Sequence, residues 1–109
     1  MNIKVERDDN IKIISLDGQL DVASSDNARD EVISLLDGKP TIISLAKVSY
    51  VSSSGLRALL MIAKTAKAKK INMVYAAAID EVIDVFEMTG FIKMLRCVKT
   101  IEDAEKALG

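Results

Sequence analysis

The chain has 109 residues, of which 50% are hydrophobic, 28% charged and only one a proline. This length suits one domain, and this composition is typical of a folded globular chain, which excludes a disordered protein or a second core. Fifteen basic and 16 acidic residues leave a net charge of −1, so nothing suggests a general attraction to nucleic acid or to anionic lipid.

The chain begins with a predicted β-hairpin. Residues 3 to 7 and 11 to 17 alternate apolar and polar side chains, and Asp8-Asp9-Asn10 separates the two segments. Apolar runs at 41 to 46, 71 to 76 and 94 to 98 predict three further strands.

Four segments of helical periodicity follow the hairpin and alternate with these strands. Their apolar faces are Ala28, Val32, Leu35 and Leu36; Leu56, Leu59, Leu60 and Ala63; Ile79, Val82, Ile83 and Phe86; and Ile101, Ala104, Ala107 and Leu108. The order is therefore ββαβαβαβα in a single domain, residues 1–109. Strands joined by helical crossovers run parallel, so we expect an α/β fold with a mainly parallel sheet and helices packed on it. Four methionines lie among apolar neighbours and are expected to fill the core: Met61, Met73, Met88 and Met94.

Several classes of function lack the residues that they need. The chain has one cysteine, Cys97, and no histidine, which excludes an intrachain disulfide, a Cys/His zinc site and the histidine-dependent catalytic triads. We therefore expect no metal, no cofactor and no catalytic residue. A flavodoxin-like enzyme or cofactor binder is an alternative that the low aromatic content, 4%, argues against.

Neither a membrane span nor a signal peptide is predicted. The longest apolar runs have six residues, whereas a membrane-spanning helix needs ~18 to 20. The first ten residues contain no apolar segment of the signal-peptide type. The expected location is the cytoplasm, without membrane insertion and without a nucleic-acid partner.

The most informative segment is VSYVSSSGLRALL, residues 48 to 60, where Ser52, Ser53 and Ser54 precede Gly55 at the start of a predicted helix. In α/β folds, ligands and partners usually bind where strands end in this way. The simplest interpretation is a serine N-cap followed by a glycine bend. The GxxxxGK[ST], GxGxxG and GxSxG patterns are all missing, so the segment is neither a nucleotide loop nor a nucleophile elbow.

Phosphorylation of a serine in this segment is another interpretation. A phosphate adds about −1.5 to −2 charges, and the helix dipole stabilises it by ~0.3 to 1 kcal/mol, so the fold should tolerate it. An unpaired charge buried at a protein contact costs ~2 to 5 kcal/mol. Such a modification would switch binding without changing the fold.

The stretch SYVSSSGLRALL resembles the signature of STAS domains, the family of bacterial anti-sigma factor antagonists. Gly18-Gln19-Leu20-Asp21 and Met88-Thr89-Gly90-Phe91 resemble the family's turns after the second strand and the third helix. Within the signature, Ser53 matches the phosphorylatable serine, Ser54 the hydroxyl after it, and Gly55-Leu56 the Gly-Leu that opens the helix.

The resemblance implies a partner-switching regulator that is not an enzyme. In that family the unphosphorylated domain binds an anti-sigma factor, itself a serine kinase, and thereby releases the sigma factor; phosphorylation ends the complex, and a serine phosphatase resets it. For Asp21 and Ser24, capping of the first helix and partner contact are equally good explanations. The expected partner-binding residues are Asp21, Ser24, Ser52, Ser53, Ser54, Gly55, Leu56 and Arg57, with Ser53 as the phosphorylation site.

Three positions depart from the family pattern. Ser52 stands where the family has an aspartate before the phosphorylatable serine, and Ser44 replaces an aspartate of the preceding strand. These two departures favour an alternative, a STAS scaffold subunit of a lipid-transport or larger signalling complex that is not phosphorylated. The third, Arg57, lies four residues beyond Ser53 on the same helical side, so its guanidinium could neutralise a phosphate on Ser53. The alternative for Arg57 is a solvated surface side chain.

Overall fold

The computed structural model describes residues 1–109 and has the predicted order ββαβαβαβα, with one additional 3₁₀ turn, η1. The strands are β1 (Asn2–Asp8), β2 (Lys12–Leu20), β3 (Thr41–Val51), β4 (Met73–Ala76) and β5 (Cys97–Val98). The helices are α1 (Ser25–Leu35), α2 (Ser53–Ala68), α3 (Asp80–Thr89) and α4 (Ile101–Leu108), and η1 is Phe91–Lys93.

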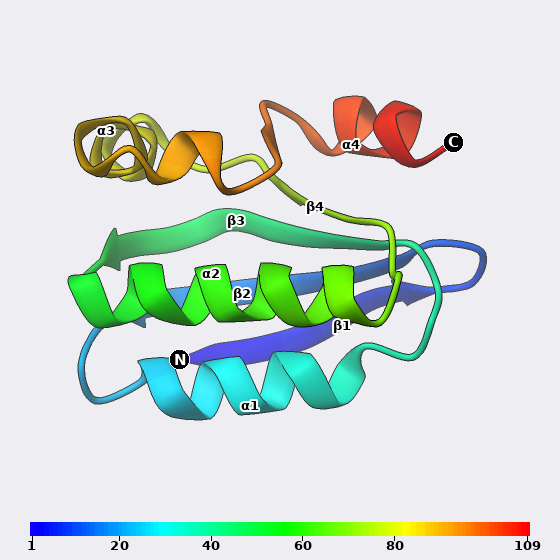
Figure 1. Ribbon diagram of the computed structural model, residues 1–109, viewed down its shortest axis with the longest axis horizontal. Coiled ribbons are helices and arrows are strands. Elements are labelled where there is room, and N and C mark those ends of the chain that lie inside the picture. Colours follow the sequence, from blue (N-terminus) through cyan, green and yellow to red (C-terminus); the bar gives the residue numbers. More distant parts are fainter.

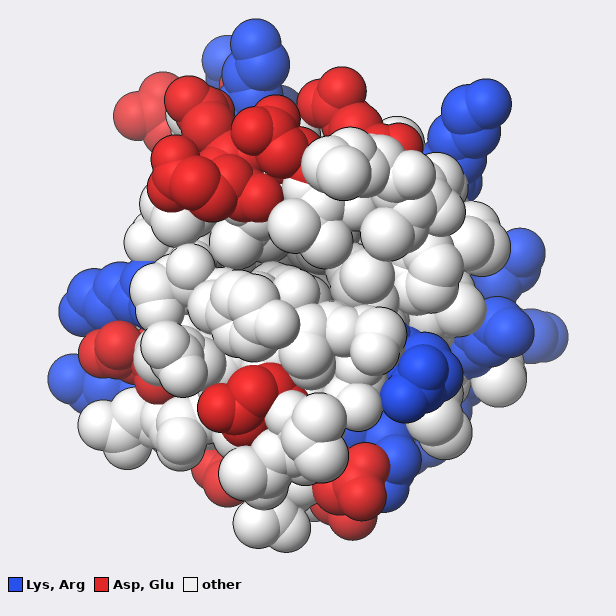
Figure 2. All heavy atoms as spheres, turned by 90° about the vertical axis from the view of Figure 1, so that its left-hand side faces the viewer, with Lys and Arg blue, Asp and Glu red and all other residues white.

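All five strands form one sheet in the order β1-β2-β3-β4-β5. The β1–β2 hairpin is antiparallel and the other three pairs are parallel, which confirms the expected mainly parallel sheet. Strands β2 and β3 end in register, with Leu20 opposite Val51. Helices α1 and α2 therefore start at the same end of the molecule, on the left in Figure 1, and Figure 2 shows this end face-on.

The central strands are buried on both faces. Ile14, Ile43 and Tyr75 point into the larger core with α1, α2 and α3, whereas Ile13, Ile42 and Val74 pack with α4 on the opposite face. Strands covered on both faces carry continuous apolar runs, which is why the sequence shows TIISLA and INMVYA.

Two strand lengths differ from the prediction. Strand β3 extends to Val51 instead of residue 46, because its polar second half still pairs with β2, for example Tyr50 with Gln19. Strand β5 has two residues instead of the expected run from 94 to 98. The chain before it forms η1, in which the Met94 N–H donates to the Phe91 carbonyl at 2.9 Å.

The expectation that the methionines fill the core is wrong for three of the four. Met73 is buried, but Met61, Met88 and Met94 are 47%, 86% and 52% exposed. On α2, for instance, the buried face holds Leu59, Ile62 and Ala66, and Met61 points away from it. Apolar character alone therefore did not identify which side of the helix a methionine occupies.

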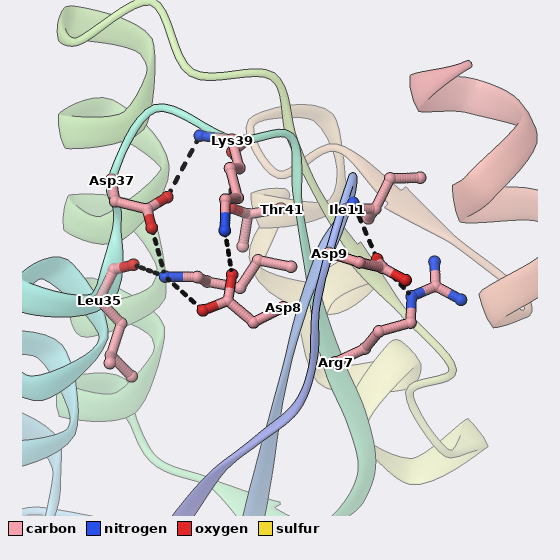
Figure 3. Close-up of polar contacts among 9 residues, drawn as sticks. Arg7, Asp8, Asp9, Ile11, Leu35, Asp37, Lys39 and Thr41 are labelled. Carbon is pink, nitrogen blue, oxygen red and sulfur yellow. Dashed lines mark hydrogen bonds and ion pairs between the residues drawn. The ribbon is translucent and has the colours of Figure 1, made fainter.

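A buried ammonium group joins the hairpin to the end of α1 (Figure 3), at the end of the molecule opposite the start of α2 (Figure 1). The side chain of Lys12 is only 6% exposed, and its Nζ donates to the Leu35 carbonyl at 2.7 Å and to the Asp37 carboxylate at 2.9 Å. Lys39 donates to Asp8 at 2.6 Å beside it. A cation at the C-terminus of a helix satisfies free carbonyls and matches the helix dipole, so this cluster fixes α1 against the sheet.

This cluster predicts a change in acid stability. The hydrogen bond from Lys12, then that from the Lys39 N–H, lowers the pKa of the Asp37 carboxyl below its ordinary value of about 3.9. A carboxyl with a lowered pKa in the folded state stabilises the fold above its unfolded pKa and loses that effect as the pH falls through the folded value. We expect Asp37→Asn to be less stable than the parent at pH 7, and this difference to shrink as the pH falls below the ordinary carboxyl pKa of about 3.9. Urea unfolding between pH 2.5 and 7 measures the free energy of unfolding of parent and variant, with Asp103→Asn as the control. A difference between parent and Asp37→Asn that stays the same at every pH would contradict the prediction.

Candidate functional site

Helix α2 begins directly after β3, and Ser52 is its N-cap. The Ser52 hydroxyl accepts a hydrogen bond from the Gly55 N–H at 3.1 Å, and the Ser52 carbonyl accepts one from the Leu56 N–H at 2.9 Å. The first bond satisfies an N–H that a helix start would otherwise leave unpaired, and the second is the first regular hydrogen bond of the helix. The N-cap interpretation of the serine segment is thus confirmed for Ser52.

The same turn is held against the end of β2. The Ser52 N–H donates to the Leu20 carbonyl at 2.8 Å. A Cβ atom at position 55 would lie 2.6 Å from the Leu20 oxygen and 2.8 Å from the Leu20 Cβ. Glycine is therefore required at position 55 by close contact with a neighbouring strand.

The three serines of the segment have different surroundings. The Ser52 hydroxyl accepts the capping bond, and the Ser54 hydroxyl accepts a bond from the Arg57 guanidinium at 3.3 Å. Ser53 is exposed and its hydroxyl makes no hydrogen bond within the protein. Among the three, the Ser53 hydroxyl is the one left free for another molecule.

Asp21 and Ser24 form a closed hydrogen-bonded turn between β2 and α1. One Asp21 carboxylate oxygen accepts from the N–H groups of Ala23 and Ser24, both at 3.1 Å. The Ser24 hydroxyl donates to the Gln19 carbonyl at 2.6 Å and accepts from the Asp21 N–H at 3.1 Å. Ser24 is the N-cap residue of α1, but its side chain makes no capping bond. The two side chains therefore order the turn that leads into α1 and do not cap the helix.

The eight predicted contact residues are not all available to a partner. Gly55 and Leu56 are buried, and the Leu56 side chain is part of the main core. They shape the turn, while Ser53 and Arg57 are exposed and Asp21, Ser24, Ser52 and Ser54 are partly exposed. Ser54 and Arg57 also line a shallow hollow with Asp26 and Arg29 of α1. The Arg57 guanidinium contacts Ser54 in this state, and no contact with Ser53 is formed.

The two family aspartates that are serines here have different structural consequences. Ser52 performs the capping that an aspartate also performs, so this exchange is compatible with the same turn. Ser44 is 8% exposed in the middle of β3, opposite Ser15 and Ala76. At ~3.3 Å per residue, roughly 23 Å of strand separate Ser44 from Val51 at the end of β3, so its exchange does not alter the exposed serine directly.

Two exposed apolar side chains at this end lie outside the eight predicted contact residues, although the sequence left Tyr50 open as a core or a partner-facing residue. Val22, at the tip of the β2–α1 turn, is 79% exposed, and Tyr50, near the end of β3, is 51% exposed. Tyr50 pairs with Gln19 across the sheet, which places it beside the β2–α1 turn. Buried apolar residues lie close to both in the sequence, namely Leu20, Val48 and Val51, so apolar character did not distinguish the exposed side chains.

The structure contains no group of three or more metal-binding side chains and no helix long and apolar enough to cross a membrane. The exposed polar side chains at the start of α2, such as Ser53 and Arg57, can be chemically modified or can contact the surface of another protein.

Loss of the N-cap gives a second testable prediction. Ser52→Ala removes the acceptor for the Gly55 N–H and should lower the free energy of unfolding by ~1 kcal/mol. Ser52→Asp should restore most of this stability, because a carboxylate also caps a helix. Urea denaturation of both variants, with Ser53→Ala as the neighbouring control, measures the effect. A Ser53→Ala loss as large as that of Ser52→Ala would contradict the assignment of the cap.

Comparison with known proteins agrees with this architecture. The sequence model of the STAS domain matches residues 2–104. The protein named "Putative anti-sigma factor antagonist BtrV", from Bordetella bronchiseptica, is 26% identical over 109 aligned residues. The alignment covers 98% of this chain and 94% of that protein.

Solved structures share the fold at lower identity. An anti-sigma factor antagonist from Mycobacterium paratuberculosis superposes with a TM-score of 0.82 at 23% identity, covering 98% of this chain and 92% of the other. The Bacillus cell fate determinant SpoIIAA in its phosphorylated form gives 0.69 at 18% identity, covering 99% and 100%. The murine anion transporter Slc26a9 gives 0.78 at 21% identity, covering 89% of this chain but 17% of the transporter. The names of the three small relatives describe regulatory proteins and not enzymes. With a family match over nearly its whole length and the fold of anti-sigma factor antagonists, the chain belongs to the STAS domain family.

Proposed function

We propose that the protein is an anti-sigma factor antagonist of the cytoplasm. It binds an anti-sigma factor of the serine-kinase type, which releases the sigma factor, and phosphorylation of Ser53 ends the complex. The observation that carries this proposal is the exposed, unbonded Ser53 hydroxyl at the start of α2. The relative named as an anti-sigma factor antagonist and the phosphorylated SpoIIAA structure support it.

The geometry accounts for a switch that leaves the fold intact. A kinase needs a hydroxyl that it can reach, and Ser53 alone of the three serines has no bond to break. A phosphate there would meet the positive end of α2, which favours negative charge. When a partner covers the same loop, the phosphate must be desolvated, and this costs ~2 to 5 kcal/mol. The partner is therefore released while the domain stays folded.

Mimicry of the phosphate tests the switch. Ser53→Asp should weaken binding to the cognate anti-sigma factor at least tenfold, because it places a charge under the partner, while unfolding stability stays within about 1 kcal/mol of the parent. Ser53→Ala, which adds no charge, should retain binding. Calorimetric titration and urea unfolding report the two quantities. Undiminished binding by Ser53→Asp would refute the switch.

Direct phosphorylation defines the modified residue. Incubation with the candidate kinase and ATP, followed by mass spectrometry, should place one phosphate on Ser53, and a serine phosphatase should remove it. Phosphate on Ser52 or Ser54 in place of Ser53 would refute the assignment. The absence of any phosphate after incubation with a kinase that binds the protein would also refute it.

The role of Arg57 can be measured on the phosphorylated protein. Its guanidinium lies one helical turn from Ser53 and needs only to leave Ser54 to reach a phosphate. A nearby cation favours the dianion, so the second pKa of the phosphoserine should be lower in the parent than in Arg57→Ala. A ³¹P NMR titration measures it, with Arg29→Ala as the control because Arg29 already pairs with Asp26 and Asp30. Identical values in parent and Arg57→Ala would dismiss the pairing.

The alternative use as a scaffold rests on Ser44 and Ser52, where the family has aspartates. It makes a different prediction in the same experiments: the kinase-type partner neither binds nor modifies the protein, and a transporter ATPase binds both the parent and Ser53→Asp.

A further inference from the structure

Helix α3 carries an unusual set of charges. It has four acidic residues, Asp80, Glu81, Asp84 and Glu87, and no basic residue. All four are exposed, and none takes part in an ion pair. Lys99 lines the same hollow as Asp80, but its ammonium lies beyond ion-pair distance. The helix therefore presents a charge of −4 that nothing in the chain neutralises by direct contact.

This arrangement does not favour the helix itself. Asp80 and Asp84 are four residues apart, and Asp84 and Glu87 three, so like charges face each other on one side of the helix. The first-turn acids suit the helix dipole, but Glu87 lies in the last turn, where the dipole disfavours a negative charge. On α1, by contrast, Arg29 contacts both Asp26 and Asp30. The demands of the fold do not explain the acids of α3.

An apolar surface lies beside these acids. Met88, on the same helix, is 86% exposed, and Val22 and Tyr50 are exposed at the ends of β2 and β3. Figure 1 places α3 and the starts of α1 and α2 at one end, and Figure 2 shows that the middle of this end is uncharged, with acidic side chains gathered above it over α3. An uncharged area beside charged side chains, together with exposed Met and Tyr residues, has the composition of a protein interface.

We propose that the outer face of α3, formed by Asp80, Glu81, Asp84, Glu87 and Met88, docks a segment rich in lysine and arginine from the same anti-sigma factor that covers the Ser53 loop. This inference rests on the proposed function and adds that the partner surface is positively charged. The acids attract the partner before contact and set its orientation, and the uncharged middle of the face supplies the apolar contact.

A second copy of this chain fits the acidic face less well. Its basic cluster, Lys64, Lys67, Lys69 and Lys70, lies at the end of α2, and at ~1.5 Å per residue this is roughly 24 Å from the start of the helix. The cluster and α3 thus lie at opposite ends of the molecule (Figure 1), so contact between them in two copies would make the protein self-associate, which the titration below detects.

The test compares two variants of equal net charge. In the first, Asp80→Asn, Glu81→Gln, Asp84→Asn and Glu87→Gln remove the acids of α3. In the matched control, Glu6→Gln, Glu31→Gln, Glu102→Gln and Asp103→Asn remove four exposed acids that also lack ion pairs. Circular dichroism and thermal unfolding establish that both variants fold. Association with the purified candidate anti-sigma factor is followed by stopped flow at several salt concentrations.

We expect the α3 variant to associate at least ten times more slowly than the parent at low salt and to lose most of the salt dependence, since electrostatic steering acts mainly on association. The control should change less than about twofold. An equal loss in both variants would show a net-charge effect and overturn the inference. Unchanged association of the α3 variant, with binding still abolished by Ser53→Asp, would overturn the inference and leave the proposed function standing.

A second readout does not depend on the anti-sigma factor. The ¹⁵N-labelled protein is titrated with a synthetic amphipathic Lys/Leu peptide helix. Amide shifts centred on residues 80 to 89, Val22 and Tyr50 support the preference of this face for a basic segment. If no candidate anti-sigma factor binds, the proposed function and the identity of the partner are refuted. Shifts centred on the control positions overturn the inference, as does concentration-dependent self-association that the α3 substitutions abolish.

Discussion

The functional end of this domain depends on the contact between the start of α2 and the end of β2. The Leu20 carbonyl accepts the Ser52 N–H at 2.8 Å, and Gly55 packs so closely over Leu20 that no side chain fits at position 55. Because β2 and β3 end in register, this one contact fixes the helix start beside the β2–α1 turn. The turn is itself closed by the hydrogen bonds between Asp21 and Ser24. Two loops that are 30 residues apart thus form one rigid surface.

That rigidity explains how three consecutive serines can have three roles. The N-cap occupies the first hydroxyl, the Arg57 guanidinium donates to the third, and helix geometry turns the second outward. A charge added to Ser53 meets a favourable dipole and no neighbouring core atom, so its main effect falls on whatever covers the loop. A switch of binding on a constant fold is the function to which this geometry is suited.

Charge is distributed differently at the two ends of the molecule. At the end opposite Ser53, the Lys12 ammonium is buried and bonded to Leu35 and Asp37, and Lys39 pairs with Asp8 (Figure 3). These charges are used within the fold, where they join the hairpin to α1. At the Ser53 end, the acids of α3 have no ion-pair partners and lie along one edge of an uncharged surface (Figure 2). The first arrangement stabilises the domain, and the second is available for recognition.

The sequence by itself was sufficient to predict the order of the elements, the mainly parallel sheet and the serine N-cap of α2. These features depend on neighbours a few positions apart, since the continuous apolar run TIISLA, the helical spacing of Leu56 and Leu59, and the position of Ser52 before Gly55 are all local. The family signature at residues 49 to 60 pointed to the same loop. What these patterns left open was which serine is free and which predicted contacts are buried.

Only the tertiary structure decided those points, because they depend on groups distant in the sequence. Gly55 is required by Leu20, 35 positions earlier, and Lys12 is buried by a carbonyl 23 residues later. Met88 and Tyr50 are exposed although they are apolar, and Leu56 is buried although it belongs to the signature. Local periodicity shows which face of an element is apolar, but only packing shows which atoms another element covers and which it leaves to solvent or to a partner.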